Sequence, residues 1–333
     1  MIAGKKAIAV TAILLPLYLF FIAGCSVEPG DSHILQAIGD TPLLKIDGVY
    51  AKAEMLNPGG SIKDRMANYV IKKAEERGDL KPGQEIIELT SGNTGAALAM
   101  VSAIKGYRLT VVLPEYTSVD KQRMIRIFGA NVVTTPAVEG FLGAKKRYDE
   151  LCLEKPGAWL PKQFENKDNI EAHRLGTGQE IIRQMNARVD AFVAGVGTGG
   201  TLIGVAKALK KVDPKVRIIA VEPAESPVLS GRKPGRHRIE GIGDDFISKI
   251  ISDNRDLIDE IVLIKSDDAV RMAKKLAEEH GILAGISSGA NMLAAKQVMQ
   301  KYGYEKVVTV LPDGGERYLP SFFEEKSDTS PKG

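Results

Sequence analysis

Residues 191–211 read "AFVAGVGTGGTLIGVAKALKK". The first five residues form a short apolar run, which favours a buried strand. Glycines and threonines follow at 195–201, and the residues after them have the apolar spacing of a helix. A strand that passes through a glycine-rich turn into a helix is the repeating unit of parallel α/β sheets. This stretch therefore predicts an α/β fold of mainly parallel strands with flanking helices.

The same alternation continues on both sides of this stretch. Short runs rich in Val and Ile predict further strands, namely "EIIEL" at 85–89, "LTVVL" at 109–113, "NVVTT" at 131–135, "RIIAVE" at 217–222, "EIVLI" at 260–264 and "KVVTVL" at 306–311. Longer amphipathic stretches lie between them, such as "DDAVRMAKKLAEEHG" at 267–281. A break at 163–169 separates two groups of strands. We expect an N-terminal α/β lobe over 34–165, a C-terminal α/β lobe over 166–323 and a polar tail over 324–333.

Composition describes an ordinary globular protein. The chain has 333 residues, 26% of them charged, and a net charge of +3. Because basic and acidic residues are interspersed, the sequence gives no sign of a nucleic-acid partner. The two cysteines, Cys25 and Cys152, cannot build a disulfide framework, and no Cys/His cluster has the spacing of a metal site.

The first 25 residues have the features of an export signal. Lys5 and Lys6 precede an uncharged run over 7–24, which ends in "IAG" before Cys25. "IAGC" resembles the lipobox of bacterial lipoproteins, in which the cysteine is lipidated, so we expect membrane attachment through residues 1–25 and a short linker over 26–33. An uncleaved membrane anchor is an alternative. A mis-assigned start codon, which would leave a cytoplasmic protein, is another.

Two glycine-rich stretches stand where a strand leads into a helix, "TSGNTG" at 90–95 and "GVGTGGT" at 195–201. Helix N-termini attract anions, and glycines let the backbone approach them closely. Two such loops suggest two anionic groups. The second loop also matches G-x-G-x-x-G through Gly195, Gly197 and Gly200, with Glu222 at the end of the next strand. Taken alone, that match would indicate an NAD-dependent dehydrogenase, but it leaves the first loop unexplained.

A lysine in "NPGGSIKDR", residues 57–65, suggests a different cofactor. Lys63 follows a Gly-Gly-Ser turn at the expected start of a helix, and Ser61 can cap that helix. If one of the bound anions is the phosphate of pyridoxal phosphate, the Lys63 amine has a partner in the cofactor's aldehyde. Without such a ligand, Lys63 would be an ordinary solvated lysine.

These motifs together resemble the cysteine synthase and cystathionine β-synthase family of pyridoxal-phosphate enzymes, fold type II. The resemblance runs from "ILQAIGDTPLLKI" to "LPDGGERYL" and so covers nearly all of the chain after the leader. Several motifs in the family's order are far more specific than one glycine loop. The resemblance implies two lobes like those of the tryptophan synthase β subunit, pyridoxal 5'-phosphate as cofactor, and a homodimer, with serine acetyltransferase as a possible partner.

The resemblance also implies roles for individual residues. Lys63 is expected to be catalytic and to bind the cofactor. Further cofactor contacts are implied for Asn93 at the phenolic oxygen, for Ser287 at the pyridine nitrogen, and for the phosphate loop Gly197, Thr198, Gly199, Gly200 and Thr201. Contacts with the substrate carboxylate or its surroundings are implied for Thr90, Ser91, Thr94, Gln163 and Gly241.

One loop departs from the family's usual cysteine synthase pattern. Residues 240–246 read "EGIGDDF", where "QGIGAGF" is typical, so Glu240, Asp244 and Asp245 are expected to affect the choice of substrate. The family's "TTG" is "GTG" at 176–178. We expect a cysteine synthase that makes L-cysteine from O-acetyl-L-serine and sulfide. Cystathionine or lanthionine synthesis and cysteine desulfhydration remain alternatives, as does, in another class, a lipid-anchored amino-acid-binding protein.

Overall fold

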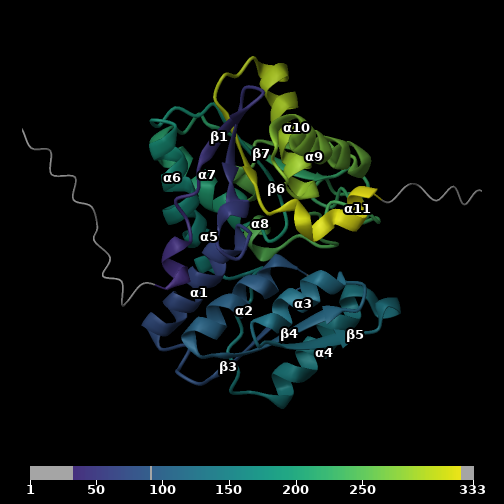
Figure 1. Cartoon of the computed structure of the whole chain (residues 1–333). Helices are drawn as coiled ribbons and strands as arrows, with labels where there is room; N and C mark the ends of the chain where they lie inside the picture. Colours follow the sequence, from purple (N-terminus) through teal and green to yellow (C-terminus); the bar gives the residue numbers. More distant parts are fainter. Residues whose placement is uncertain (1–32, 91, 324–333) are drawn as a thin grey trace, which may run out of the picture. The chain divides into compact units, whose positions relative to one another are not determined.

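Two sheets organise residues 33–90 and 92–323, the part of the chain that the computed structural model describes (Figure 1). The larger sheet has the strand order β1-β2-β9-β6-β7-β8, and the smaller one has the order β3-β4-β5. Every pairing is parallel except that of β1 with β2. The expected α/β fold is confirmed. The predictions made for residues 1–25, including Cys25, for most of the linker, for Ser91 and for the tail lie outside the described residues.

All seven strands that the sequence predicted are present, with ends within one residue of the expected bounds. They are β3 (Glu85–Leu89), β4 (Arg108–Pro114), β5 (Asn131–Thr135), β6 (Ala191–Gly195), β7 (Arg217–Pro223), β8 (Glu260–Ile264) and β9 (Val307–Leu311). Their continuous apolar character follows from burial on both faces, which parallel sheets require.

The hairpin of β1 (Leu43–Ile46) and β2 (Val49–Ala53) was not predicted. Its two-residue turn consists of Asp47 and Gly48, whose φ angles of 48° and 87° fit the turn type that joins twisted strands. β2 pairs in parallel with β9, so the hairpin extends the larger sheet. The expected N-terminal lobe over 34–165 includes this segment, but the structure places it in the sheet formed with β6 to β9. The pairing partner lies more than 250 residues away, which no local pattern can reveal.

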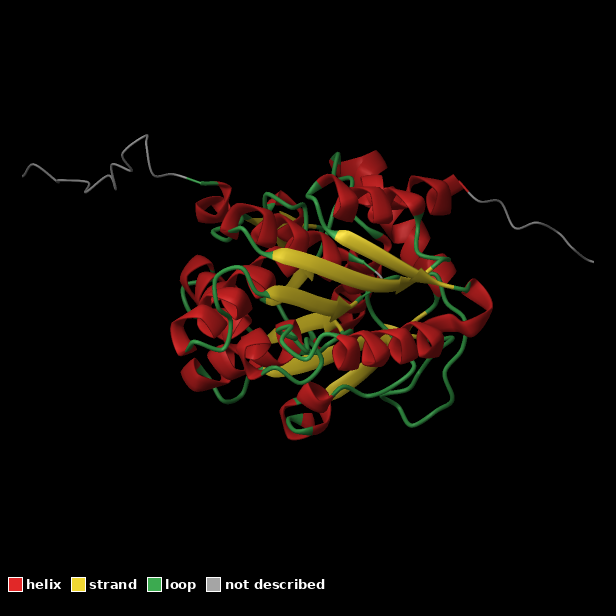
Figure 2. Cartoon of the chain, turned by 90° about the horizontal axis from the view of Figure 1, so that it is seen from below, coloured by secondary structure: helices red, strands yellow, loops and turns green. Residues whose placement is uncertain are grey.

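Helices cover both faces of the strands (Figure 2). They are α1 (Lys63–Arg77), α2 (Asn93–Lys105), α3 (Val119–Ile127), α4 (Gly140–Glu154), α5 (Lys167–Ala172), α6 (Gly178–Gln184), α7 (Gly200–Val212), α8 (Lys249–Ser252), α9 (Ser266–His280), α10 (Ile286–Tyr302) and α11 (Leu319–Phe323). Along β6, Ala191 and Val193 pack into the core formed with α9 and α10, while Phe192 and Ala194 pack into the core formed with α7. Within the described ranges, no helix is long and apolar enough to cross a membrane.

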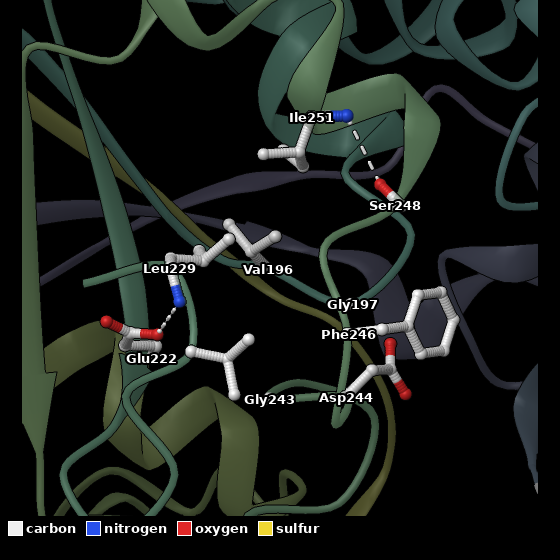
Figure 3. A pocket seen from close by; sticks show the side chains of 10 residues that line it. Val196, Gly197, Glu222, Leu229, Gly243, Asp244, Phe246, Ser248 and Ile251 are labelled. Carbon is white, nitrogen blue, oxygen red and sulfur yellow. Dashed lines mark hydrogen bonds between the residues drawn. The ribbon is translucent and has the colours of Figure 1, made fainter. Parts of the chain in front are cut away.

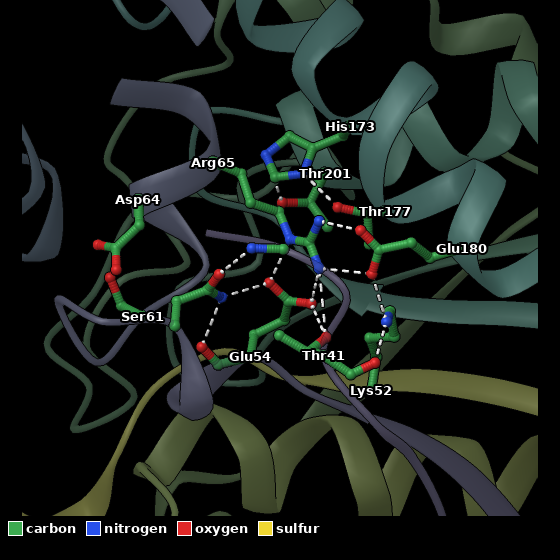
Figure 4. Close-up of polar contacts among 12 residues, drawn as sticks. Thr41, Lys52, Glu54, Ser61, Asp64, Arg65, His173, Thr177, Glu180 and Thr201 are labelled. Atoms are coloured by element: carbon green, nitrogen blue, oxygen red, sulfur yellow. Dashed lines mark hydrogen bonds and ion pairs between the residues drawn. The ribbon is translucent and has the colours of Figure 1, made fainter. Parts of the chain in front are cut away.

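A buried ion cluster fixes α1, the helix that begins at Lys63, against the larger sheet (Figure 4). Arg65 donates to Glu54 at 2.6 and 2.8 Å and to Glu180 of α6 at 2.6 and 2.8 Å. Lys52 of β2 completes the cluster, 2.5 Å from Glu180. Burial raises the pKa of Glu180, but Arg65 and Lys52 outweigh it and lower that pKa to about 2. The cluster therefore joins residues 52–65 to Glu180 of α6, which is 115 positions from Arg65.

Candidate active site

Lys63 lies at the start of α1, directly after the turn that the sequence singled out. Gly60 has a φ of 76°, which favours glycine, and Ser61 Oγ accepts the backbone N–H of Lys63 at 3.3 Å. Burial lowers the pKa of the Lys63 amine, and the negative charges of Asp313 and Asp244 oppose that shift. A lowered pKa leaves more of the amine neutral near pH 7, as a nucleophile or a general base needs.

The predicted phosphate loop, Gly197 to Thr201, follows β6 and includes the first two residues of α7. Because α7 begins at Gly200, the N–H groups of its first turn have no acceptor within the helix. Gly199 has a φ of 87°, a backbone conformation that residues other than glycine rarely adopt. The loop therefore offers the N–H groups and the positive helix end that bind a phosphate.

Two hydroxyls of this loop are held by neighbouring side chains. Thr198 Oγ1 accepts a hydrogen bond from the Asn169 amide at 3.0 Å. Thr201 Oγ1 lies 3.3 Å from Nε2 of His173, whose Nδ1 is 3.0 Å from the hydroxyl of Thr177. Burial and then the positive charge of Lys63 lower the pKa of His173, so that imidazole is neutral at pH 7. His173 thus links the phosphate loop to the surroundings of Lys63.

The two segments expected to hold the substrate carboxylate meet in the structure. Thr94 Oγ1 donates to the Gln163 side chain at 2.7 Å, and Gln163 Nε2 donates to the carbonyl of Leu89 at 3.1 Å. Thr90 is buried at the end of β3, and its hydroxyl accepts the N–H of Gly92 at 3.3 Å. Residues separated by almost 70 positions therefore form one hydrogen-bonded group next to the glycine loop at 90–95.

Asn93 and the segment that carries Ser287 meet at Asp313. The Asn93 amide donates to Asp313 Oδ2 at 2.6 Å. Ser287 is 5% exposed in the first turn of α10, and Gly285, which precedes that turn, donates its N–H to the carbonyl of Asp313 at 3.0 Å. The expected contacts with the phenolic oxygen and with the pyridine nitrogen thus lie on neighbouring segments.

The loop at 240–246 packs directly on the phosphate loop. Gly243 donates its N–H to the carbonyl of Val196 at 2.9 Å. A Cβ atom on Gly197 would lie 2.5 Å from the carbonyl oxygen of Gly241, so only glycine allows this approach. Asp244 is half-buried and lines a pocket beside this contact, with Gly197, Phe246 and Ser248 also in its wall (Figure 3).

The acids of this loop differ in their surroundings. The pKa of Asp244 is raised to about 6, mainly by burial; the positive charge of Lys63 opposes this shift, and the negative charge of Asp245 adds to it. Asp245 is exposed, as is Glu240, whose carboxylate pairs with the buried Lys121 of α3. Asp244 is therefore the acid of this loop whose charge acts on Lys63.

Glu222, which completed the dinucleotide pattern in the sequence, is occupied elsewhere. It is 1% exposed, and its carboxylate accepts N–H groups from Leu229 and Ser230 at 2.8 and 3.1 Å and the Ser230 hydroxyl at 2.5 Å. These bonds hold the turn after β7. The Glu222 carboxylate therefore already has hydrogen-bond donors from the protein, and it is not free to bind the ribose of a dinucleotide.

Among the residues of this region that sequence reasoning missed are Asp313 and Lys121. Asp313 stands directly after β9 and Pro312, and an acid at the carboxyl end of a buried strand is a usable signal. Lys121 gives no such signal, because it looks like any lysine in an amphipathic helix.

The residues that surround Lys63 fit pyridoxal phosphate. The donor set contains an amine of lowered pKa, the N-terminus of α7 for a phosphate, and the Asn93 amide and the Ser287 hydroxyl for the ring. The positive charge of Lys63 lowers the pKa of His173, which lies 3.3 Å from the hydroxyl of Thr201 in the phosphate loop. The negative charge of Asp313, which accepts the Asn93 amide, raises the pKa of Lys63. The amine therefore lies within electrostatic reach of both ends of the site.

Comparison with known proteins agrees with this arrangement. The profile of the family described as "Pyridoxal-phosphate dependent enzyme" matches residues 34–313. A cysteine synthase from Staphylococcus aureus is 48% identical over 297 residues, which cover 86% of this chain and 95% of the relative.

Solved structures give the same result. O-acetylserine sulfhydrylase isoform 3 from Entamoeba histolytica superposes with a TM-score of 0.83 and 38% identity, covering 96% of each chain. An O-acetylserine-dependent cystathionine β-synthase from Helicobacter pylori has a TM-score of 0.83 and 40% identity, covering 87% of this chain and 97% of the other.

Proposed function

The chain belongs to the cysteine synthase and cystathionine β-synthase family of pyridoxal-phosphate-dependent enzymes, and from this premise we propose that it makes L-cysteine from O-acetyl-L-serine and sulfide. The reaction is a β-replacement: sulfide adds to the β-carbon of the amino acid, and acetate leaves. The observation that carries the proposal is the setting of Lys63, an amine of lowered pKa near the glycine loop at 197–201.

In this proposal, the phosphate loop and the ring contacts hold the cofactor. The first-turn N–H groups of α7 and the Thr201 hydroxyl bind the phosphate, and Asn93 and Ser287 contact the ring. When bound, pyridoxal phosphate supplies an electron sink for the charge that develops at the substrate's α-carbon.

The substrate's carboxylate is assigned to the group around Gln163. Thr90, Ser91 and Thr94 supply hydroxyls, and the bond from Thr94 to Gln163 at 2.7 Å keeps two of these contacts together. Nζ of Lys63 then takes the α-proton, a role that its lowered pKa supports. A fixed carboxylate and a fixed amine together orient the substrate's α-carbon.

The lysine is tested directly by trapping. Purified protein should be yellow, and borohydride should fix the cofactor to the peptide that contains Lys63. Lys63→Ala should lose turnover, with cysteine formation from O-acetylserine and sulfide as the assay, even if some cofactor remains bound through its phosphate. Attachment of the cofactor to a different lysine would contradict the assignment.

A second candidate activity rests on Asp244, the half-buried acid whose charge acts on Lys63. A carboxylate near the bound amino acid favours an incoming thiol that carries an ammonium group, such as homocysteine or cysteine. Cystathionine or lanthionine formation would then occur on the same scaffold, as would release of sulfide from cysteine. The likeness to the H. pylori cystathionine β-synthase supports this candidate. Product analysis with O-acetylserine, serine or cysteine as donor, and sulfide or homocysteine as acceptor, separates the two.

Family membership also supports a homodimer that has serine acetyltransferase as a possible partner. Light scattering should give twice the 35.9 kDa of one chain. A mass of 35.9 kDa at micromolar concentration would argue against the dimer.

We further propose that the protein is attached to a membrane through its N-terminus. Support comes from Lys5, Lys6, the uncharged run over 7–24 and Cys25 in "IAGC". The basic start would leave the catalytic part outside the cytoplasm. The protein should fractionate with membranes and carry lipid on Cys25, and Cys25→Ser should release it. Recovery of the unaltered protein as a soluble chain without lipid would contradict the lipoprotein and favour a cytoplasmic enzyme.

A further inference from the structure

Asp313 lies where three cofactor-site segments meet. It follows β9 and is 1% exposed. Its backbone forms an isolated antiparallel bridge with Ser61, two residues before Lys63, and its carbonyl accepts the N–H of Gly285 at 3.0 Å. Its side chain accepts the Asn93 amide at 2.6 Å. One residue therefore contacts the lysine turn, the segment before Ser287, and Asn93.

The two carboxylate oxygens of Asp313 differ. Oδ2 accepts from Asn93 at 2.6 Å and from the Tyr318 hydroxyl at 2.5 Å. Oδ1 is buried and has no hydrogen-bond partner among the residues that the structure describes. A Cβ on Gly285 would lie 2.1 Å from Oδ1, so the glycine leaves room for this oxygen. A buried, unbonded carboxylate oxygen costs free energy, which indicates that a partner comes to it during function.

The bonds around Asn93 fix the orientation of its amide. Nδ2 donates to Asp313, and Oδ1 accepts from Arg317 at 3.2 Å. If the amide were turned over, its oxygen would face the Asp313 carboxylate and its nitrogen would face the Arg317 guanidinium. Neither pair can form a hydrogen bond, so only the observed orientation of the amide satisfies both neighbours. The second N–H of that amide is then left to donate to the cofactor.

Burial raises the pKa of Asp313, and the positive charges of Arg317 and Lys121 oppose that shift, but both of these cations have other partners. Arg317 donates to the carbonyls of Gly59 and Gly60 at 2.5 and 2.8 Å. Lys121 pairs with Glu240. Lys63 is a further cation near Asp313. Of the two acids whose charge favours the protonated form of Lys63, Asp313 has the larger effect and Asp244 the smaller.

We propose that Asp313 is a positioning residue that orients the Asn93 amide toward the cofactor and holds the Lys63 ammonium at Oδ1 whenever that amine carries a proton. The inference rests on the proposed function for the identity of the cofactor. It adds a residue to which the family resemblance gave no role. In this role Asp313 acts through Asn93 and Lys63 and not directly on the substrate.

The contact with Lys63 is tested by titrating the amine. In full-length protein freed of cofactor, the rate at which acetic anhydride labels Lys63 is followed against pH by mass spectrometry. In Asp313→Asn the midpoint should move to lower pH, because the anion that stabilises the ammonium is gone. Asp64→Asn is the matched control: it removes a buried carboxylate next in sequence, which accepts the Gly59 N–H at 2.6 Å, and should leave the midpoint in place. An unchanged midpoint in folded Asp313→Asn would overturn the contact.

If Asp313→Asn fails to fold, Lys63→Ala tests the same pair from the other side. Loss of the cation should let Asp313 keep its proton to higher pH, which is visible as the infrared band of a protonated carboxyl in protein carrying isotopically labelled aspartate. If the Asp313 carboxyl loses its proton at the same pH in Lys63→Ala as in the unaltered protein, the contact is likewise overturned. Neither measurement depends on enzyme activity. Both can therefore be interpreted even if the proposed reaction is wrong.

The contact with Asn93 is tested by comparing cofactor binding in the two single variants and in the double variant. Binding of pyridoxal phosphate, followed by protein fluorescence, should weaken by about tenfold in Asp313→Asn and by a similar factor in Asn93→Ala. The double variant should bind no more weakly than Asn93→Ala alone, because Asp313 acts on the cofactor through that amide. Factors that multiply in the double variant would overturn the positioning role.

Discussion

At the scale of single residues, Glu88 shows how burial controls protonation beside the site. It lies on β3 and is 3% exposed, with Oε1 accepting the Leu89 N–H at 2.9 Å and Oε2 buried without a hydrogen-bond partner in the described residues. Burial raises its pKa from the ordinary 4.5 to about 8. The folded protein therefore keeps a proton on Glu88 that the unfolded chain has lost at neutral pH.

We predict that Glu88 makes stability fall as pH rises from 4.5 to about 8. Across that window the folded state binds one more proton than the unfolded state, and the loss amounts to roughly 3–5 kcal/mol. In Glu88→Gln the slope should become smaller by the part that Glu88 contributes, as shown by the free energy of unfolding measured with urea at several pH values; Asp64 and Asp244, whose pKa values burial also raises, keep a slope of the same sign.

Glu85→Gln, on the same strand, is the control. Burial opposes ionisation of Glu85, but its hydrogen bonds with Lys155 and Thr110 outweigh that effect and lower its pKa. Its contribution is therefore lost only as pH falls below the ordinary 4.5, and its removal should leave the slope at higher pH intact. An equal slope in Glu88→Gln and the unaltered protein would show that Glu88 is ionised in the folded state.

At the scale of elements, the loop over 240–246 connects the parts of the chain around the two sheets. Its Gly243 bonds to Val196 beside β6 at 2.9 Å, and its Glu240 pairs with Lys121 of α3. The Lys121 amine also lies 4.5 Å from the centre of the Tyr318 ring. Because the loop is held at Glu240 and at Gly243, the residue before Asp244, the position of Asp244 is defined.

We predict that this loop affects the choice of acceptor. In Asp244→Ala with Asp245→Gly, the rate ratio of sulfide to homocysteine or cysteine should move toward sulfide by roughly tenfold, or about 1.4 kcal/mol. The carboxylate attracts an ammonium group, whereas hydrosulfide is an anion and gains nothing from it. The exposed Asp245→Gly alone is the matched control and should change the ratio little. If overall activity is intact and the ratio is unchanged in the double variant, the loop does not select the acceptor.

At the scale of the whole molecule, the cluster around Arg65 joins the N-terminal hairpin, α1 and α6. Arg65 and Glu180 alone are 115 positions apart, and both acids that bind Arg65 are buried. A buried charge that loses its partner is costly, since water cannot replace that partner. The position of Lys63 at the start of α1 therefore depends on contacts outside the site.

We predict that Arg65→Met lowers the free energy of unfolding by about 3–5 kcal/mol, because Glu54 would remain buried without its cation and Glu180 would keep only Lys52. Arg77→Met, on the same helix, removes an exposed arginine whose partners are Asp79 and Asp168 and should cost less than about 1 kcal/mol. Denaturant unfolding of the two variants measures the difference. Similar small losses in both would mean that the cluster adds nothing to stability.

The sequence alone determined strands β3 to β9 and the glycine loops, and it singled out Lys63 as the candidate lysine. Each of these is a local pattern: the apolar runs of β3 to β9, the glycines at 197–200, and the Gly-Gly-Ser turn before Lys63 are carried by neighbouring residues. Local patterns follow from backbone sterics and periodicity, which act over a few residues.

Only the tertiary structure decided which of these patterns meet. The pairing of β2 with β9 and the bond from Asn93 to Asp313, 220 residues apart, have no local signature. The same holds for the two aspartates of the 240–246 loop, since the sequence could not tell that Asp244 is half-buried and Asp245 exposed. Burial and charge at these positions depend on residues far away in the chain, so the pKa of Lys63, and with it its chemistry, is a property of the fold.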